Sequence, residues 1–266
     1  MKLTNEQINF YHENGYLIMN DVFSAEEVQR LNSDIQNFSK IEASPNIIRE
    51  KNGAIRSIFA PHKYKESFNA LYKQDRLVNA AEQLIGNAVY LYQYKLNNKQ
   101  ALKGEWWEWH QDFPYWNIDD GVKKPDMISV MILLQNTDFI QGPLLIIPGS
   151  HKEGVVDFQP KAHLLNMPEG DYANALNSDL KYTVKKELLI KMLDNKKVVI
   201  AEGNAGTVVF FHPNVFHSSS SNLSPYDRNT AIITYNDLEN LPDPARTRPE
   251  FLCSRDFELI STMKSV

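Results

Sequence analysis

The second half of the sequence is a series of short β-type runs separated by turn residues, and this series limits the folds open to the chain. Long helical segments are rare between the runs. Such a pattern favours an antiparallel sandwich or closed barrel over a sheet built from βαβ units. The runs between residues 88 and 236 are AVYLYQYKL, WWEWHQDF, MISVMILLQN, GPLLIIPG, KVVIAE, GTVVFFH, VFHSS and NTAIITYN.

The first part of the chain has helix signals instead. Thr4 with Gln7, and Ser24 with Glu27, have the spacing of capping boxes. The first box predicts a short helix that ends at a glycine in position 15, and the second a helix to about residue 38. A strand is expected over residues 16–23 and a further helix over residues 75–84.

The order of these segments predicts one domain over residues 1–266. N-terminal helices take up about residues 4–86, a β core about 88–236, and a C-terminal segment 237–266. Residues 157–195 are polar and partly helical in pattern, and we interpret them as an insertion or lid on the core. No Gly/Ser-rich or Pro-rich linker divides the chain.

Composition narrows the function classes. The net charge of −5 and the lack of a long basic block argue against nucleic acid as a partner. The single cysteine, Cys253, allows neither an intrachain disulfide nor a thiolate metal cluster, which fits a reducing cytoplasm. The apolar runs are too short to span a bilayer. We expect a cytoplasmic protein that acts on a small molecule; the pattern predicts no oligomeric state.

The stretch EWWEWHQDFPYW places His110 and Asp112 among six aromatic residues. In an extended strand, residues two apart point to the same face, so this pair could bind one metal ion. His-x-Asp alone is a weak signal, and a hydrogen-bonded core histidine beside an unrelated carboxylate is the plain alternative. We expect three of its four tryptophans, at positions 106, 107 and 109, to serve packing.

A second segment strengthens the metal hypothesis. Here a strand leads into a Pro-Asn turn, then to His217, and Arg228 follows eleven residues later. Two histidines and one carboxylate with open positions form the triad of non-haem Fe(II) oxygenases, and a buried arginine suits a carboxylate. His212, five residues before His217, is the alternative third ligand.

These segments resemble the phytanoyl-CoA dioxygenase family of Fe(II)- and 2-oxoglutarate-dependent oxygenases. GYLIMNDVFSAEEVQRL is similar to the family's N-terminal strand and helix, and QGPLLIIPGSHKEG to its NGPLL-VPGSH loop. The likeness extends from about Glu6 to Asp256 and is greatest toward bacterial hydroxylases of free proline, then of ectoine. The resemblance implies a mainly β protein with flanking helices around a double-stranded β-helix, or jelly-roll, core.

Carried over by position, the resemblance implies a role for each matching residue. Fe(II) is expected at His110, Asp112 and His217. The cosubstrate 2-oxoglutarate is expected at Arg228, which pairs with its distal carboxylate, and at Ser219, Gln93 and Asn97. The substrate is expected at Trp116, Phe211 and Arg248, with a surface-loop position as the equal alternative for Arg248.

The implied reaction is hydroxylation of an unactivated C–H bond by O2, with 2-oxoglutarate converted to succinate and CO2. Proline or a cyclic analogue such as pipecolate is the favoured substrate. Phe113 and Ile232 depart from the ectoine enzymes' pattern, which weakens the case for ectoine. Another small zwitterion, an acyl-CoA and a non-catalytic jelly-roll binding protein are the alternatives. Asp112 argues against a halogenase, which has a small residue there.

Overall fold

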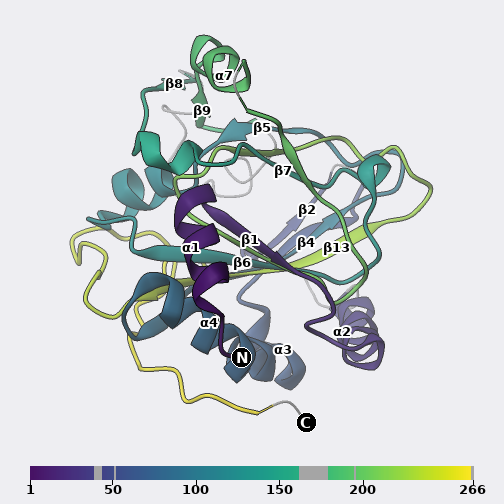
Figure 1. Cartoon of the computed structure of the whole chain (residues 1–266). Coiled ribbons are helices and arrows are strands. Elements are labelled where there is room, and N and C mark those ends of the chain that lie inside the picture. Colours follow the sequence, from purple (N-terminus) through teal and green to yellow (C-terminus); the bar gives the residue numbers. More distant parts are fainter. Residues whose placement is uncertain (39–43, 51, 162–178, 195, 265–266) are drawn as a thin grey trace.

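The computed structural model describes residues 1–38, 44–50, 52–161, 179–194 and 196–264 (Figure 1). Its α-helices in these ranges are α1 (Asn5–Asn14), α2 (Ala25–Phe38), α3 (Glu66–Tyr72), α4 (Asp75–Ile85) and α7 (Lys186–Leu193). Its strands are β1 (Tyr16–Met19), β2 (Ile47–Arg49), β3 (Ile55–Phe59), β4 (Val89–Lys99), β5 (Trp107–His110), β6 (Met127–Leu133), β7 (Leu144–Ile146), β8 (Phe158–Pro160), β9 (Tyr182–Val184), β10 (Val199–Ala201), β11 (Val208–Phe211), β12 (His217–Ser219) and β13 (Arg228–Asp237).

The strands form two main antiparallel sheets. The larger has the order β1-β11-β6-β13-β4-β3-β2, and the smaller has the order β10-β7-β12-β5. Strands far apart in sequence are neighbours in both sheets, as expected for a jelly roll. The mainly β fold with a jelly-roll core, predicted from the sequence, is therefore confirmed.

The N-terminal helices form where the capping signals predict them. The Thr4 hydroxyl accepts the Gln7 amide N–H at 3.2 Å while the Gln7 side chain accepts the Thr4 N–H at 2.9 Å, so both halves of the capping box are present. Helix α1 ends at Gly15, whose φ of 77° is left-handed and favours glycine. The predicted strand at residues 16–23 is shorter: β1 ends at Met19 and a turn follows.

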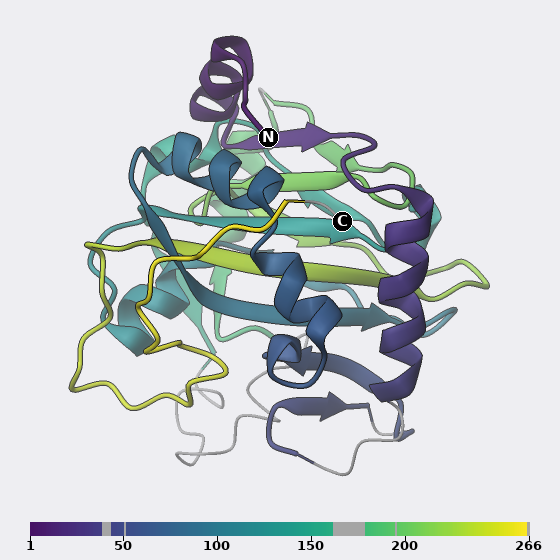
Figure 2. The ribbon, with the colours of Figure 1, turned by 90° about the horizontal axis from the view of Figure 1, so that it is seen from below.

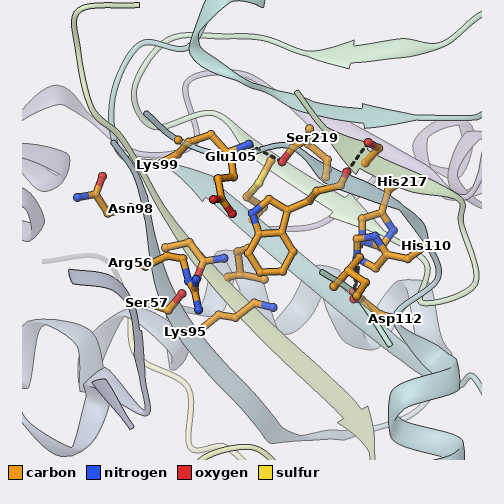
Figure 3. A pocket seen from close by; sticks show the side chains of 18 of the residues that line it. Arg56, Ser57, Lys95, Asn98, Lys99, Glu105, His110, Asp112, His217 and Ser219 are labelled. Atoms are coloured by element: carbon orange, nitrogen blue, oxygen red, sulfur yellow. Dashed lines mark hydrogen bonds and ion pairs between the residues drawn. The ribbon is translucent and has the colours of Figure 1, made fainter. Parts of the chain in front are cut away.

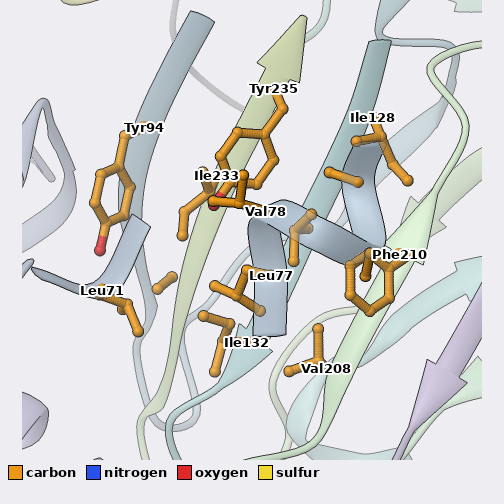
Figure 4. Close-up of a cluster of buried hydrophobic side chains, with 14 of the residues drawn as sticks. Leu71, Leu77, Val78, Tyr94, Ile128, Ile132, Val208, Phe210, Ile233 and Tyr235 are labelled. Atoms are coloured by element: carbon orange, nitrogen blue, oxygen red, sulfur yellow. The ribbon is translucent and has the colours of Figure 1, made fainter. Parts of the chain in front are cut away.

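Helices α2, α3 and α4 cover one face of the larger sheet (Figure 2). Alternate residues of each strand point to this face, so β11 contributes Val208 and Phe210 to the core with the helices. Leu77 and Val78 of α4 lie against these strands (Figure 4). This side of the sheet is filled with apolar side chains.

The other face of the larger sheet packs against the smaller sheet. The intervening residues of β11, Val209 and Phe211, meet Leu144 and Ile146 of β7 in a separate apolar cluster. At one end of this inner layer, the apolar contacts give way to polar and ionisable side chains. The candidate site lies there, between the two sheets.

The predicted insertion, residues 157–195, is described only in part. It contains β8, which pairs with β9 in a small two-stranded sheet, and α7. Residues 162–178, within the predicted insertion, lie outside the described residues. In the described part of the chain, no helix has the length and apolar character needed to cross a membrane.

Candidate active site

Three predicted metal ligands meet between β5 and β12. The two strands pair so that His217 lies directly opposite His110, and the two imidazole rings are 4.0 Å apart. An Asp112 carboxylate oxygen lies 3.8 Å from Nε2 of His110 and 3.7 Å from Nε2 of His217. The three donor atoms lie within 4.8 Å of one another, a separation at which one metal ion can contact them all (Figure 3).

Asp112 reaches this position by a different route from the predicted one. Strand β5 ends at His110, so Asp112 is not the next inward residue of a continuous strand. Its backbone N–H instead donates to the carbonyl of Pro213 at 2.9 Å, which holds the chain after β5 against the turn before β12. The Pro-Asn turn before β12 therefore also holds Asp112 beside the two histidines.

The protein orients both imidazoles for metal binding. Nδ1 of His110 lies 2.7 Å from the Glu108 carbonyl and Nδ1 of His217 lies 3.0 Å from the Val215 carbonyl. An N–H on each Nδ1 donates to its carbonyl, which leaves Nε2 as the lone-pair donor facing Asp112.

The charge states also suit a divalent cation. Burial, reinforced by His217, lowers the pKa of His110 to about 3, so this imidazole is neutral at physiological pH. Burial opposes ionisation of Asp112, but His217, Lys95 and His110 outweigh it and keep the Asp112 pKa below its ordinary value. Neutral imidazoles and an ionised carboxylate are the forms that bind metal.

A second polar group lies where β13 begins. Arg228 is buried, and its Nη1 donates to the Gly142 carbonyl at 2.7 Å. Its Nε has no hydrogen-bond partner among the described residues, although a buried guanidinium N–H normally has one. Lys99 is paired with Arg228 in the β4–β13 register and donates to the Ser219 hydroxyl at 2.7 Å.

Burial acts on the charge of both basic side chains at this end. Burial, together with the nearby Arg228, lowers the pKa of Lys99 to about 6, and burial lowers that of Arg228 to about 10. No ion pair to either side chain occurs within the described residues. A bound carboxylate would supply both a partner for the Arg228 Nε and a negative charge beside Lys99 and Arg228.

Strand β4 supplies a row of polar side chains to the pocket. Gln93, Lys95, Asn97 and Lys99 alternate along the strand and all line the same cavity. The Gln93 amide donates to the Leu252 carbonyl at 2.7 Å, and Oδ1 of Asn97 is buried without a partner in the described chain.

Aromatic side chains form the apolar part of the lining. Trp116 belongs to a π-helical turn over Tyr115–Asp119 and packs against Tyr92, with ring centroids 5.5 Å apart. Phe211 ends β11, and its ring lies 5.2 Å from that of His217. Trp107, expected to serve packing, also lines the pocket.

Arg248 lines the pocket as predicted, but its guanidinium already has partners. Nε and Nη2 bind the two oxygens of Asp120 at 2.7 and 2.5 Å, and Asp119 lies 3.9 Å from Nη1. Tyr92 donates to the same Asp120 carboxylate. This bidentate pair fastens the C-terminal segment to the π-helical turn, so we do not assign a substrate carboxylate to Arg248.

The alternative ligand His212 lies outside the metal group. Its Nδ1 accepts the Asn214 N–H at 3.0 Å, and its ring packs 5.0 Å from that of His151. All of the residues predicted for the site do line one cavity: Gln93, Asn97, His110, Asp112, Trp116, Phe211, His217, Ser219, Arg228 and Arg248.

The sequence interpretation missed Lys95, Lys99 and Trp107. A signal for the two lysines was present, because they alternate with Gln93 and Asn97 along a run predicted as a strand. Once those two residues are placed in the pocket, the two-residue period places Lys95 and Lys99 there as well. No comparable signal separates Trp107 from its neighbouring tryptophans.

A jelly roll that brings two histidines and one carboxylate together, with a buried arginine in the same pocket that has no ion pair among the described residues, defines the class of non-haem Fe(II) oxygenases that use a carboxylate cosubstrate. Comparison with known proteins specifies the family. The chain belongs to the phytanoyl-CoA dioxygenase family, whose sequence pattern matches residues 11–230. It is an Fe(II)- and 2-oxoglutarate-dependent dioxygenase.

Characterised relatives cover most of the chain. The L-proline trans-4-hydroxylase of Streptomyces griseoviridis is 36% identical over 246 residues, which are 92% of this chain and 91% of that enzyme. The ectoine dioxygenase of Bordetella bronchiseptica is 31% identical over 279 residues, covering 99% of this chain and 87% of that enzyme.

Solved structures agree with the fold. The crystal structure of EctD from S. alaskensis with 2-oxoglutarate and 5-hydroxyectoine has a TM-score of 0.83 at 27% identity. It covers 99% of this chain and 88% of that chain. A further structure of EctD with bound Fe has a TM-score of 0.82 at 28% identity, with the same coverage.

Proposed function

We propose that this dioxygenase hydroxylates an unactivated C–H bond of a small free amino acid, with L-proline or a cyclic analogue such as pipecolate as the substrate. The observation that carries the proposal is that the His110–Asp112–His217 group and Arg228 line one pocket, and that the buried Nε of Arg228 has no partner among the described residues. The 36% identity to a proline hydroxylase supports an amino-acid substrate.

In this proposal, Nε2 of His110, Nε2 of His217 and a carboxylate oxygen of Asp112 hold Fe(II). Iron bound there supplies the activation of O2, which the family couples to oxidation of 2-oxoglutarate to succinate and CO2. The carbonyls of Glu108 and Val215 keep the two Nε2 atoms directed at the metal position. Three protein ligands leave coordination positions open, which a catalytic site needs and a structural site lacks.

The cosubstrate is bound by the group at the start of β13. Arg228 binds the distal carboxylate of 2-oxoglutarate through its free guanidinium edge, and Lys99 adds a second cation beside it. Ser219 and Asn97 contribute hydrogen-bonding groups at the same wall, and Gln93 stands farther along β4. We call Arg228, Lys99, Ser219 and Asn97 the cosubstrate cradle. Its charge suits a dicarboxylate, because Arg228 and Lys99 are buried without a carboxylate partner in the described chain.

Trp116, Phe211 and Trp107 form apolar walls suited to a pyrrolidine ring. These side chains orient one carbon of the substrate toward the metal position and exclude water from that position. Catalytic rate then depends on position more than on acid–base chemistry, because the reactive oxidant belongs to the cofactor.

Ectoine is the second candidate substrate, since several relatives at about 30% identity are ectoine dioxygenases. Against it, Ile232, which lines the pocket, departs from the ectoine enzymes' pattern. Phe113, the other departure, lies outside the lining and packs in an apolar cluster with Tyr92 and Trp116. Turnover of ectoine with no turnover of any proline analogue would decide for this alternative.

The test is succinate release from purified protein with Fe(II), 2-oxoglutarate and a panel of the twenty amino acids, pipecolate and ectoine. We expect proline or pipecolate to stimulate release and to gain one oxygen atom, detected by mass spectrometry. His110→Ala should abolish turnover, whereas His212→Ala, the matched control, should retain it. Activity in His110→Ala, or loss of activity in His212→Ala with intact folding, would contradict the metal assignment.

A further inference from the structure

Lys95 is a cation in the pocket that the proposed reaction does not yet use. It lies at the middle of β4, between Gln93 and Asn97, and is only partly exposed. Within the described residues its ammonium makes no hydrogen bond or ion pair. Burial lowers its pKa, and the charge of Asp112 opposes that shift. A half-buried ammonium group that lines a cavity without a partner is suited to an anionic ligand.

The other buried cations of the pocket have assignments already. Arg228 and Lys99 stand together at Ser219, and Arg248 is bound by Asp120. Arg56 lies 3.6 Å from Glu50. Apart from the exposed Lys103, Lys95 is therefore the cation in the described lining that remains for a second carboxylate.

The location of Lys95 separates it from the cosubstrate cradle. Lys95 and Lys99 are four residues apart on one strand, which places their Cα atoms about 13 Å apart. Their side chains lie on different sides of the cavity, with Lys99 at Ser219 and Lys95 directed toward Asp112 (Figure 3). One carboxylate held by Arg228 and Lys99 leaves Lys95 available for another molecule.

A free amino acid brings a second carboxylate into this pocket. We propose that Lys95 binds the carboxylate of the substrate and is the specificity-determining cation of the site; this inference rests on the proposed function. The distance from that carboxylate to the metal position then selects the carbon that is hydroxylated. Substrates without a carboxylate lose this contact.

Lys95→Met tests the assignment. The Michaelis constant for L-proline should rise about 10- to 100-fold, the effect of removing a hydrogen bond to a charged group. The Michaelis constant for 2-oxoglutarate should change by less than about threefold. The matched control is Lys103→Met, which removes an exposed lysine at the rim of the same pocket and should change neither constant.

Prolinamide supplies an independent readout. Wild-type protein should prefer proline to prolinamide, and Lys95→Met should lose most of that preference because the discriminating contact is gone. Lys95→Arg keeps the charge and should restore part of it. If the substrate panel identifies another amino acid, the same comparison is made with that acid and its amide.

Failure of this inference is distinguishable from failure of the proposed function. Anaerobic Fe(II) plus 2-oxoglutarate should give a visible charge-transfer band in wild type and in Lys95→Met alike, and its absence in wild type would contradict the proposed function. A normal band with an unchanged constant for proline would overturn the role of Lys95. A raised constant for 2-oxoglutarate alone would assign Lys95 to the cosubstrate and equally overturn it. If Lys95→Met does not fold, Lys95→Gln replaces it.

Discussion

The start of β13 and the C-terminal segment each place an arginine in the same pocket, and the surroundings of the two differ. Arg248 has a buried carboxylate, Asp120, in bidentate contact and a second, Asp119, nearby. Arg228 has one hydrogen bond to a backbone carbonyl and a partnerless Nε among the described residues. Both guanidinium groups are withdrawn from water, so burial alone does not distinguish them.

The effect of these surroundings appears in the pKa values. Burial lowers the pKa of Arg228 to about 10, and nothing in the described chain offsets it. Burial also acts to lower the pKa of Arg248, but Asp120 outweighs it and raises the pKa above the ordinary arginine value. A buried cation whose charge is matched within the protein stabilises the fold, whereas one left unmatched is suited to an anionic ligand.

The largest effect is expected from breaking the matched pair. Arg248→Met leaves the fully buried Asp120 carboxylate without its cation and should lower the free energy of unfolding by about 3–5 kcal/mol. Urea unfolding measures this loss. The exposed Arg246→Met is the control, with an expected change within about 0.5 kcal/mol. Adding Asp120→Asn to Arg248→Met should recover part of the stability, and a single variant as stable as wild type would contradict a structural role.

The unmatched arginine should give the opposite result. Arg228→Met should raise the Michaelis constant for 2-oxoglutarate about 30- to 1000-fold, or about 2–4 kcal/mol, because a buried charge contact is lost. The free energy of unfolding should stay the same or increase, since an unpaired buried charge is removed. Arg228→Lys keeps the charge but not the bidentate geometry. Its Michaelis constant for 2-oxoglutarate should lie between those of wild type and Arg228→Met. If Arg228→Met lowered the free energy of unfolding as much as Arg248→Met does, Arg228 would also have a structural role, which would contradict the proposed difference between the two arginines.

The contrast between these arginines also shows where sequence reasoning ends. Arg228 could be assigned because it follows His217 at a spacing that resembles a known family, and that spacing is local. The partner of Arg248 is Asp120, 128 residues earlier in the chain. Nothing in the sequence around either residue indicates that they meet, so Arg248 was predicted to be available to a substrate.

Local signals predicted the local structure well. The Thr4–Gln7 capping box and Gly15 set the bounds of α1 because they satisfy the helix-end groups within a few residues. The position of Asp112 was harder to predict, because it depends on a hydrogen bond to Pro213, a residue far from it in the sequence. The sequence named the three residues that the structure brings together, His110, Asp112 and His217, but not the path by which the chain brings them together.

The smallest predicted effect concerns the pH dependence of the cosubstrate cradle. The pKa of Lys99 is lowered to about 6 by burial and by Arg228, so in the ligand-free protein the amine is mostly neutral above that pH. A bound carboxylate favours the ammonium form and raises this pKa. Binding of 2-oxoglutarate should therefore take up a proton between about pH 6 and the higher pKa of the complex, and affinity should fall by at most about tenfold per pH unit in that window.

Calorimetric titration of the Fe(II)-loaded protein with 2-oxoglutarate under anaerobic conditions measures this proton directly. In two buffers of different ionisation enthalpy, the apparent binding enthalpies should differ by the heat of up to one proton per site. Lys99→Met should bind more weakly and lose the buffer dependence, whereas Lys103→Met should retain it. Proton uptake that persists in Lys99→Met would place the titrating group elsewhere, and Arg228 would then be the sole cation that depends on the cosubstrate for its counter-charge.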